Sequence, residues 1–488
     1  MKKKHNIKIK DLIKIGNLRQ IRNFKEINKI SKFKSFTKPI TFIKIRNFTH
    51  PIIFPAARKP ETTGKIQRVF TCIGICAASL WLTGCKDGAI QDPENISNLY
   101  MAGSMEEAPV VDYPVPQPLP NVLADRRGYS VGDVKKAFVT GRELPDSFTL
   151  VNAKTGEAAY YGTIKDKAYN AGLARYVGYA DFSQVDEPGS YYVECELVGQ
   201  SYRFDIQEQL YLELFNENYA EILKDCESGG LPVAGAMRLL EAYEWYGELF
   251  PDQNRNDIPD VLEKLQGWVA HTEENGAGQG QEALYAAFLA KYSYNYKNYD
   301  YQYATECLKR AATVWGQMPD AAGKGADRFY ALTELFRATG LNTYRNGILE
   351  YKGVFENDRK YLEEEGYLYG SMTYLMTRQK VDAALCEELI YTIMSKGEEI
   401  SEQYRNLIAP APPGSSAPAD LMKYMSNLSC ANYILNIYQY TNIIEECLHF
   451  LMGRNMESVN YYEGGDRTRY LLWFAQLAAA YEDMMGVD

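Results

Sequence analysis

The feature that most constrains the fold is a nearly continuous series of amphipathic helical segments from Leu210 to the end of the chain. In each segment apolar residues recur at i, i+3 or i+4, and i+7, which is the spacing of one helix face. These segments are 210–226, 234–250, 258–274, 282–296, 303–318, 326–340, 381–404, 425–441, 443–455 and 468–485. Roughly 280 residues with ten to twelve helices and short loops predict paired helices packed as a toroid or solenoid. The Pro-rich segment 408–420 is expected to be a loop at its rim.

The stretch from Tyr129 to Ile206 has a different pattern of apolar residues. Short runs rich in Val, Tyr, Phe and Thr alternate with turns at Lys-Thr-Gly, Glu-Pro-Gly and Val-Gly-Gln. This spacing predicts an immunoglobulin-like β-sandwich, which we place at residues 123–208. The Cys…Trp…Cys pattern of antibody domains is missing, so the sequence does not predict an antibody-type domain.

The N-terminal part has the features of an export signal. Residues 1–50 hold 15 Lys and Arg against Asp11 and Glu26, a net charge of +13. Because the whole chain has a net charge of −10, the remaining residues carry a net charge of −23. Residues 1–64 are expected to be a basic extension or a mis-assigned start. Residues 65–85 combine a basic flank, an apolar run and Leu-Thr-Gly-Cys, which resembles a bacterial lipobox with Cys85 as the lipidated residue. Residues 86–122 are an acidic, Pro-bearing linker. We therefore expect an exported lipoprotein, anchored in a membrane at the cell surface or in the periplasm.

Charge and cysteine usage exclude several classes of function. The acidic body argues against binding of nucleic acid, which needs clustered Lys and Arg. The cysteines beyond Cys85 show no C-x-x-C pair, so neither a zinc site nor a dense disulfide framework is expected. Buried free thiols are the preferred interpretation, with one disulfide as the alternative. They are Cys195, Cys226, Cys307, Cys386, Cys430 and Cys447.

Several strings resemble glycoside hydrolase family 9, of the cellulase type with an N-terminal immunoglobulin-like domain. Residues 181–206 are similar to a conserved run of that leading domain, and 256–269 resemble the family's Gly-Ile-Pro-Asp helix start. Residues 297–315 and 331–346 resemble two barrel helices, and 450–455 match its Leu-Gly-Arg-Asn segment. The resemblance implies an (α/α)6-type barrel at residues 209–488 and inverting hydrolysis of O-glycosyl bonds in β-glucans such as cellulose.

The family's catalytic motifs are missing from the places where the resemblance puts them. An inverting glycosidase needs one carboxylate as base and one carboxylic acid. The family's base lies in an Asp-Ala-Gly-Asp stretch between Gly-Gly and Ala-Tyr-Glu, where this chain has only Leu231-Pro232-Val233. Thr468 stands at the place of the acid. The sequence therefore leaves open whether the protein is an enzyme, and predicts reduced, altered or absent activity.

Two interpretations follow from this loss. Replacement carboxylates could assemble a rebuilt site from Asp225 or Glu227 with Glu463 or Asp466, although solvated loop charges are the simpler reading. Alternatively, the protein is a non-catalytic glycan-binding or protein-interaction scaffold. In either case a polysaccharide or oligosaccharide of the β-glucan class is the expected partner. The candidate substrate-binding residues are Trp245, Trp268, Tyr367, Arg454, Tyr461 and Tyr462.

One segment has oxygen-bearing side chains at the spacing of a calcium-binding loop. Oxygen-bearing side chains occur at positions 1, 3, 5, 9 and 12 of residues 252–263. The candidate ligands are Asp252, Asn254, Asn256, Asp260 and Glu263. The first-turn acids Asp260 and Glu263 can equally complement the helix dipole. No cofactor is required by the expected chemistry, and a structural calcium ion is one interpretation of this loop. Beyond Cys85 the chain has only His271 and His449, far apart, which argues against a His-based metal site or triad.

Overall fold

The computed structural model describes residues 120–485 except 172, 320–324, 358–361, 406–417, 436–438 and 456–458. The described residues belong to one compact unit. The predicted basic extension, the signal segment with Cys85 and nearly all of the linker lie outside the described residues, as does most of the Pro-rich segment 408–420.

The first part of the described chain is a β-sandwich. Antiparallel pairing runs β1-β3-β6-β5-β4-β7-β9, and β2 joins the end of this order by pairing in parallel with β9. The long strand β5 pairs with β6 in one sheet and with β4 in the other, so it links the two layers. The strands are β1 (Val122–Leu123), β2 (Tyr129–Ser130), β3 (Lys136–Gly141), β4 (Ser147–Asn152), β5 (Ala158–Asn170), β6 (Arg175–Asp181), β7 (Gly189–Cys195), β8 (Gly199–Gln200) and β9 (Phe204–Gln207).

Alternation along the strands explains the core of this sandwich. In β7, Tyr191, Val193 and Cys195 are buried while the residues between them are not, which is the period of two expected for a strand with one covered face. Phe148, Leu150 and Phe204 pack into the same core from neighbouring strands. The predicted immunoglobulin-like β domain is confirmed.

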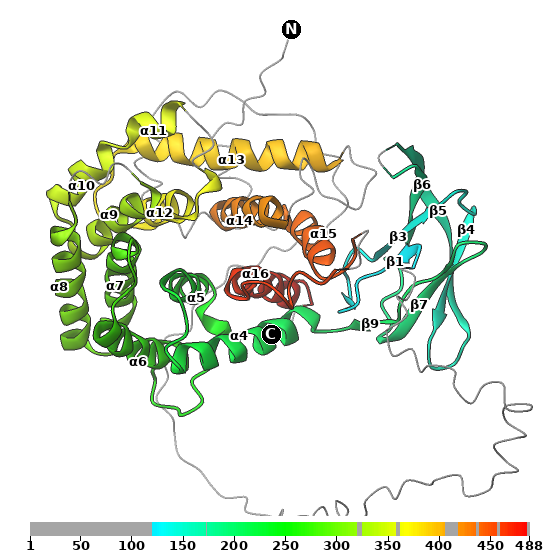
Figure 1. Cartoon of the computed structure of the whole chain (residues 1–488), viewed down its shortest axis with the longest axis horizontal. Helices are drawn as coiled ribbons and strands as arrows, with labels where there is room; N and C mark the ends of the chain where they lie inside the picture. Colours follow the sequence, from blue (N-terminus) through cyan, green and yellow to red (C-terminus); the bar gives the residue numbers. More distant parts are fainter. Residues whose placement is uncertain are drawn as a thin grey trace, which may run out of the picture. The chain divides into compact units, whose positions relative to one another are not determined.

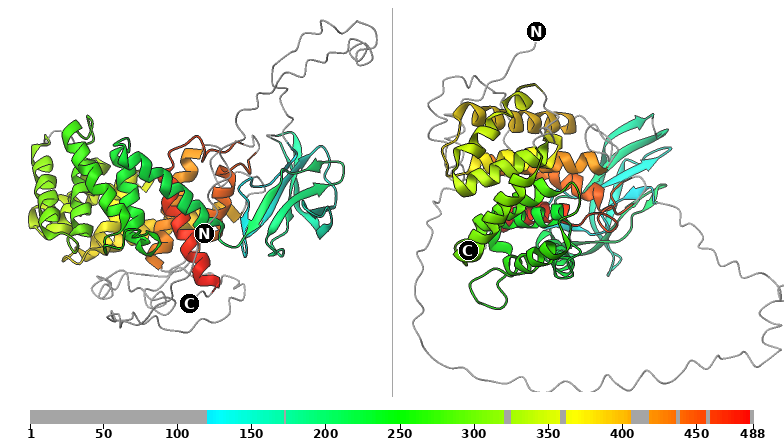
Figure 2. Two further views of the ribbon diagram at one scale, coloured as in Figure 1. Left: turned by 90° about the horizontal axis from the view of Figure 1, so that it is seen from below. Right: turned by 60° about the vertical axis from the view of Figure 1, so that its left-hand side comes forward.

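The second part consists of helical hairpins. Each hairpin joins an outer helix to an inner helix, and the inner helices α5, α7, α9, α12, α14 and α16 gather at the centre (Figure 1). Figure 2 shows the same hairpins from two other directions. The helices are α4 (Leu210–Glu227), α5 (Val233–Trp245), α6 (Asp260–Asn275), α7 (Glu282–Tyr296), α8 (Tyr301–Gln317), α9 (Ala326–Thr339), α10 (Asn342–Leu349), α11 (Lys352–Asn357), α12 (Glu365–Met376), α13 (Ala383–Arg405), α14 (Pro418–Leu435), α15 (Thr441–Leu451) and α16 (Thr468–Met485). This arrangement confirms the predicted α/α barrel.

α12 is the inner helix that the sequence pattern did not predict. In α12, ten consecutive residues from Gly366 to Leu375 are buried, so apolar and small residues occur on every side of the helix. A helix surrounded by other helices has no polar face and therefore no 3.6-residue pattern. The sequence nevertheless predicted the inner helices α7 and α9, which have similarly long buried runs.

Two further observations concern the cysteines and the length of the apolar helices. The six cysteines of the described residues are all free and buried, which confirms buried thiols and makes the alternative of a disulfide wrong. Burial raises the pKa of Cys195 and Cys226 to about 12, so these thiols are unreactive at neutral pH. Within the described part of the chain, no helix is both long and apolar enough to span a bilayer.

Candidate functional site

A cavity of about 310 Å³ lies at the N-terminal ends of the inner helices. Each of the inner helices contributes to its wall. Charged groups and aromatic rings share this wall, a mixture that suits binding of a small polar molecule. The charged wall residues are Arg238, Glu241, Asp327, Glu365 and Arg469, and the aromatic ones are Tyr330, Tyr369 and Trp473.

Four side chains form a closed set of ion pairs at this cavity, which we call the mouth cluster: Arg238, Glu365, Asp466 and Arg469. Arg238 lies between two carboxylates, with its Nε 2.9 Å from Glu365 Oε2 and its Nη1 2.6 Å from Asp466 Oδ2. Arg469 completes the set, 3.3 Å from Glu365 Oε1 and 3.7 Å from Asp466 Oδ2. Glu365 and Arg469 are each 34% exposed, so water reaches the cluster.

The chain enters the first inner helix through a short turn at residues 228–232. Gly229 has a φ of 71°, and a Cβ there would lie 2.3 Å from the His271 ring, so only glycine fits. The backbone N–H groups of Gly230 and Leu231 both donate to the carbonyl of Asp225. The Trp268 indole N–H donates to the Leu231 carbonyl at 2.8 Å. The turn is therefore held by α4 and α6, and it contains no side-chain carboxylate.

Thr468, at the predicted position of the family's acid, begins α16 and packs against α5. Its methyl group lies 3.2 Å from where a Cβ would stand on Gly235, so the glycine permits this close approach. Its hydroxyl donates to Asp466 Oδ1 at 2.6 Å and accepts from Arg238 at 3.1 Å. Burial opposes ionisation of Asp466, but the Thr468 hydrogen bond and the Arg238 charge outweigh it and lower the pKa. Asp466 is thus held as a carboxylate, which does not suit a general acid.

A buried charge cluster reaches the cavity through Glu241, and we call it the buried cluster: Glu241, Glu244, Lys291, Glu334 and Arg337. Lys291 Nζ lies 2.8 Å from Glu241, 2.5 Å from Glu244 and 3.3 Å from Glu334. Arg337 pairs with both Glu244 and Glu334. Burial raises the pKa of Glu241 in spite of the Lys291 charge. In Glu244, burial opposes ionisation, but the charges of Arg337 and Lys291 outweigh it and lower the pKa. The cluster joins α5, α7 and α9 to one another.

The four carboxylates predicted as substitutes for the catalytic pair have different surroundings. Asp225 and Glu227 lie exposed at the end of α4, where Glu227 pairs with Lys264 at 2.6 Å. Glu463 is exposed on the turn before α16, and Asp466 belongs to the mouth cluster. Of the four, Asp466 alone bonds to a residue that lines the cavity.

The predicted aromatic platforms lie mostly in the protein interior. Trp245 is 5% exposed and stacks on Tyr433 with ring centroids 4.3 Å apart, and Trp268 is 2% exposed. Tyr367 is buried against Phe329 and its neighbours. Tyr462 donates a hydrogen bond to Asn218 at 3.3 Å, and the half-buried Tyr461 stacks on Phe450. None of these five rings is among the residues that line the cavity in the described part of the chain.

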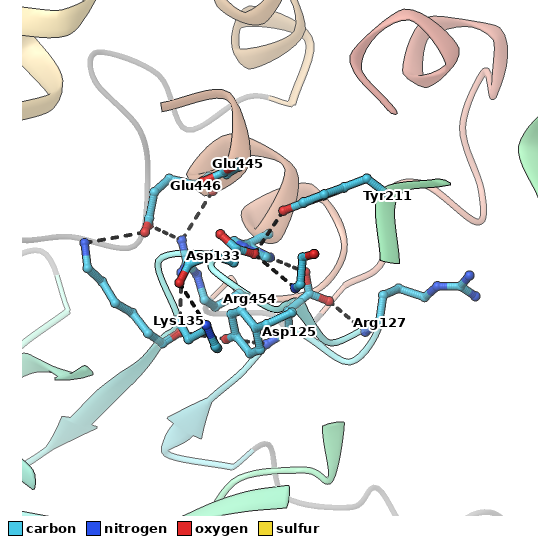
Figure 3. Close-up of polar contacts among 12 residues, drawn as sticks. Asp125, Arg127, Asp133, Lys135, Tyr211, Glu445, Glu446 and Arg454 are labelled. Carbon is cyan, nitrogen blue, oxygen red and sulfur yellow. Dashed lines mark hydrogen bonds and ion pairs between the residues drawn. The ribbon is translucent and has the colours of Figure 1, made fainter. Parts of the chain in front are cut away.

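Arg454, the remaining predicted substrate-binding residue, lies where the sandwich meets α15. It is 4% exposed, pairs with Glu446 and donates to the Lys136 carbonyl. Figure 3 shows Arg454 beside a second group of polar residues contributed by both domains.

This group is centred on His449, and we call it the interface cluster: Asp125, Asp133, Tyr211, Glu445 and His449. The His449 ring lies between two carboxylates of the sandwich, with Nδ1 2.7 Å from Asp125 and Nε2 3.2 Å from Asp133. Tyr211 of α4 donates to Asp133 at 3.1 Å. Burial disfavours a charged imidazole, but Asp133 and Asp125 outweigh it and raise the pKa of His449 to about 9. The cluster therefore contains an imidazolium at neutral pH, buried between the two domains.

The predicted calcium loop folds back on its own side chains. Asp252 accepts the backbone N–H groups of Asn256 and Asp257, and the side-chain amides of Asn254 and Asn256 both donate to Glu263 at 2.7 Å. Asp260 is buried and accepts from the Gln253 backbone instead. Across the described ranges, no group of three or more His, Cys, Asp or Glu is placed to hold a metal ion. Asp252, Asn254, Asn256 and Glu263 therefore bond within the loop, whereas the Asp260 carboxylate accepts from the Gln253 backbone.

The sequence did not predict the polar residues of the cavity wall as a group, because their grouping depends on the packing of separate hairpins. Arg238, Asp327, Glu365 and Arg469 each lie in the first two turns of an inner helix. One signal was present in the sequence: in an α/α barrel, all loops that lead into inner helices meet at the same end. Charged residues just after those loops could have been grouped on that basis.

Comparison with known proteins covers both parts of the chain. Residues 117–200 match the family model described as the cellulase N-terminal immunoglobulin-like domain. Among curated proteins no match is found.

Three of the similar solved structures are family 9 proteins. A metagenome-derived glycoside hydrolase family 9 endoglucanase aligns with a TM-score of 0.58 at 16% identity, over 70% of this chain and 84% of that one. The family 9 protein of Bacteroides ovatus gives 0.55 at 14% identity, over 70% and 86%. AaCel9A, solved with a cellobiose-like isofagomine, gives 0.53 at 14% identity, over 70% and 84%. The chain is thus similar to family 9 glycoside hydrolases in both of its parts, with a sandwich that matches the cellulase N-terminal domain and a fold shared with the family's endoglucanases.

Proposed function

We propose that this protein is a lipid-anchored surface protein that binds a β-glucan or a related glycan in the cavity of its helical barrel. The supporting observation is the cavity itself, which lies at the N-terminal ends of the inner helices and has a wall of charged and aromatic residues. Sugars present hydroxyl groups and apolar C–H faces, so they need hydrogen-bonding groups and rings side by side. Arg238, Arg469 and the rings of Tyr330 and Tyr369 supply both kinds of contact.

The same geometry argues against hydrolysis by the family's own acid and base. The turn at residues 228–232 contains no carboxylate, and Thr468 has no ionisable group. Asp466, next to it, is bound by Arg238 and is kept ionised. Catalysis at these positions would lack both proton-transfer groups that an inverting glycosidase needs.

The membrane anchor in this proposal is inferred from the sequence. The lipobox-like Leu-Thr-Gly-Cys ends an apolar run that follows a basic flank, and the linker after Cys85 would hold the folded part away from the bilayer. Replacement of Cys85 by Ser should move the protein from the membrane fraction to the soluble fraction of its host. A Cys85→Ser protein that stays with the membranes would contradict the anchor.

Binding is tested with the purified protein and a panel of soluble β-glucans in affinity gel electrophoresis. We expect at least one glycan to retard the wild-type protein and Arg469→Ala to lose this retardation without a change in melting temperature. Arg310→Ala is the matched control, because Arg310 is a similarly exposed arginine on the outer helix α8, paired with Glu273. If no glycan retards the wild type, or if Arg469→Ala binds like the wild type, glycan binding in the cavity is excluded. A role as a protein-interaction scaffold then becomes the leading alternative.

A further inference from the structure

The formal charges at the cavity do not cancel. The mouth cluster combines two arginines with two carboxylates, so its charges balance. The buried cluster combines Lys291 and Arg337 with three glutamates, which leaves one negative charge in excess. Asp327 adds a further carboxylate to the cavity wall and forms no ion pair with the residues that the structure describes. The cavity and the clusters around it therefore have an excess of negative charge.

Asp327 faces the charge of another carboxylate. It lies in the first turn of α9, and Glu365 is the first residue of α12. Gly366 allows these two helix ends to approach, because a Cβ there would lie 2.6 Å from the carbonyl carbon of Ala326 and 2.9 Å from the backbone nitrogen of Asp327. Burial and, to a lesser degree, the charge of Glu365 raise the pKa of Asp327. A cation bound beside Asp327 would offset this repulsion.

A second carboxyl group of the cavity wall has an oxygen without a partner. Glu241 is 2% exposed, and its Oε2 lies 2.8 Å from Lys291 Nζ and accepts from the Tyr330 hydroxyl at 2.5 Å. Its Oε1 has no hydrogen-bond partner among the described residues. A buried carboxylate oxygen without a donor costs free energy, so a donor on a ligand would be bound there. Tyr330 follows Asp327 by one turn of α9, which puts both carboxyl groups in the same part of the wall.

The wall also has a donor without an acceptor and two rings. The indole N–H of Trp473, a residue that is 1% exposed, has no acceptor in the described part of the chain. The rings of Tyr330 and Tyr369 lie in the same wall, and aromatic faces attract cations as well as the C–H faces of sugars. The cavity thus combines acceptors and negative charge for a cationic donor with a donor for a hydroxyl oxygen. An amino sugar presents both kinds of group.

We propose that this cavity selects a glycan with a free ammonium group, such as a β-1,4-linked oligosaccharide of glucosamine, over its neutral counterparts. This inference rests on the proposed glycan binding and names the class of sugar. The ammonium group binds beside Asp327 and offsets the excess negative charge. The sugar hydroxyls bond to the unpartnered groups of Glu241 and Trp473.

The preference is tested with three trisaccharides that differ only at C2: the glucosamine trimer, cellotriose and the N-acetylglucosamine trimer. Isothermal titration calorimetry measures their affinities at pH 6, where the amine is protonated, and at pH 8.5, where it is neutral. We expect the glucosamine trimer to bind about tenfold more tightly than cellotriose at pH 6, because a hydrogen bond to a charged group is stronger than a neutral one. The preference should disappear at pH 8.5, and the neutral N-acetyl trimer should show no such preference at either pH.

Asp327→Asn removes the charge and keeps the size of the side chain. We expect the ratio of the affinities for the glucosamine trimer and cellotriose to fall by about tenfold in this variant. Glu363→Gln is the matched control, since Glu363 is an exposed carboxylate close to α12 that pairs with Lys423 and is not among the lining residues. It should keep the ratio of the wild type. Melting temperatures of both variants show whether the fold is unchanged.

The outcomes separate this inference from glycan binding. Wild-type protein that binds cellotriose or another β-glucan as tightly as the glucosamine trimer overturns the preference and leaves the binding proposal standing. A preference as strong in Asp327→Asn as in the wild type also overturns the inference, because the ammonium group would then bind elsewhere. Wild-type protein that binds neither these trisaccharides nor any β-glucan of the panel overturns both proposals together.

Discussion

The interface cluster and the mouth cluster both place a cation between two carboxylates, yet they differ in their access to water. His449, Asp125 and Asp133 have fully buried side chains, whereas Arg238 is 13% exposed and its partners Glu365 and Asp466 are 34% and 41% exposed. A buried charge that loses its partner cannot be hydrated, while a partly exposed one can. The comparison suggests that the first cluster joins the domains, and that the second can exchange its partners for a ligand.

The largest expected effect is the loss of the central cation of the interface cluster. His449→Leu leaves the Asp125 and Asp133 side chains buried without their partner, so we expect the free energy of unfolding to fall by about 3–5 kcal/mol. Urea denaturation measures this change. His271→Leu is the control, because His271 is the other histidine of the folded part and is exposed, and it should change stability by less than about 0.5 kcal/mol. Equal losses in the two variants would contradict the distinction between the clusters.

The next effect is a pH dependence confined to the interface cluster. The pKa of His449 in the folded protein, about 9, lies above its ordinary value of 6.5. Stabilisation from the imidazolium is therefore complete below pH 6.5 and is lost as the pH rises through about 9. Burial and the charge of Asp133 also raise the pKa of Glu445, which lowers stability in the same direction as the pH rises. Urea unfolding between pH 6 and 9.5 should show this decline, and a decline just as steep in His449→Leu would assign it to other groups.

A smaller effect is expected at the mouth cluster. Arg238→Ala leaves Glu365 and Asp466 free to bind water and Arg469. We therefore expect the free energy of unfolding to fall by about 1 kcal/mol or less. A stability loss as large as that of His449→Leu would show that the two clusters contribute equally to the stability of the fold.

The smallest effect is expected at the predicted calcium loop, whose side chains already bond to one another. We expect millimolar calcium to raise the free energy of unfolding by less than about 1 kcal/mol. Differential scanning calorimetry with calcium and with a chelator measures this. A rise of several kcal/mol that disappears in Glu263→Gln would instead establish a structural calcium site.

The sequence predicted most of the helices and the β domain from local patterns. The outer helix α8 and the final helix α16 were predicted within two residues, because their apolar positions recur with the helix period. The inner helix α12 was not predicted, whereas the similarly buried inner helix α7 was. The β domain was predicted from alternation and turn residues, which are local properties of the chain.

The candidate site could be predicted only in part. The sequence located the shortened turn at Leu231 and the threonine at position 468, since both follow from alignment of neighbouring residues. It could not group Asp327 with Glu365, because their proximity depends on Gly366 and on the packing of two separate hairpins.

The sequence by itself determined the order of the parts and the helical period, since both are properties of residues close together in the chain. Tertiary structure alone decided which charges meet. His449 pairs with Asp125 across 324 positions, and Arg238 reaches Asp466 across 228. Such pairs form only when folding brings distant segments together and removes water from between them, and no local pattern encodes that.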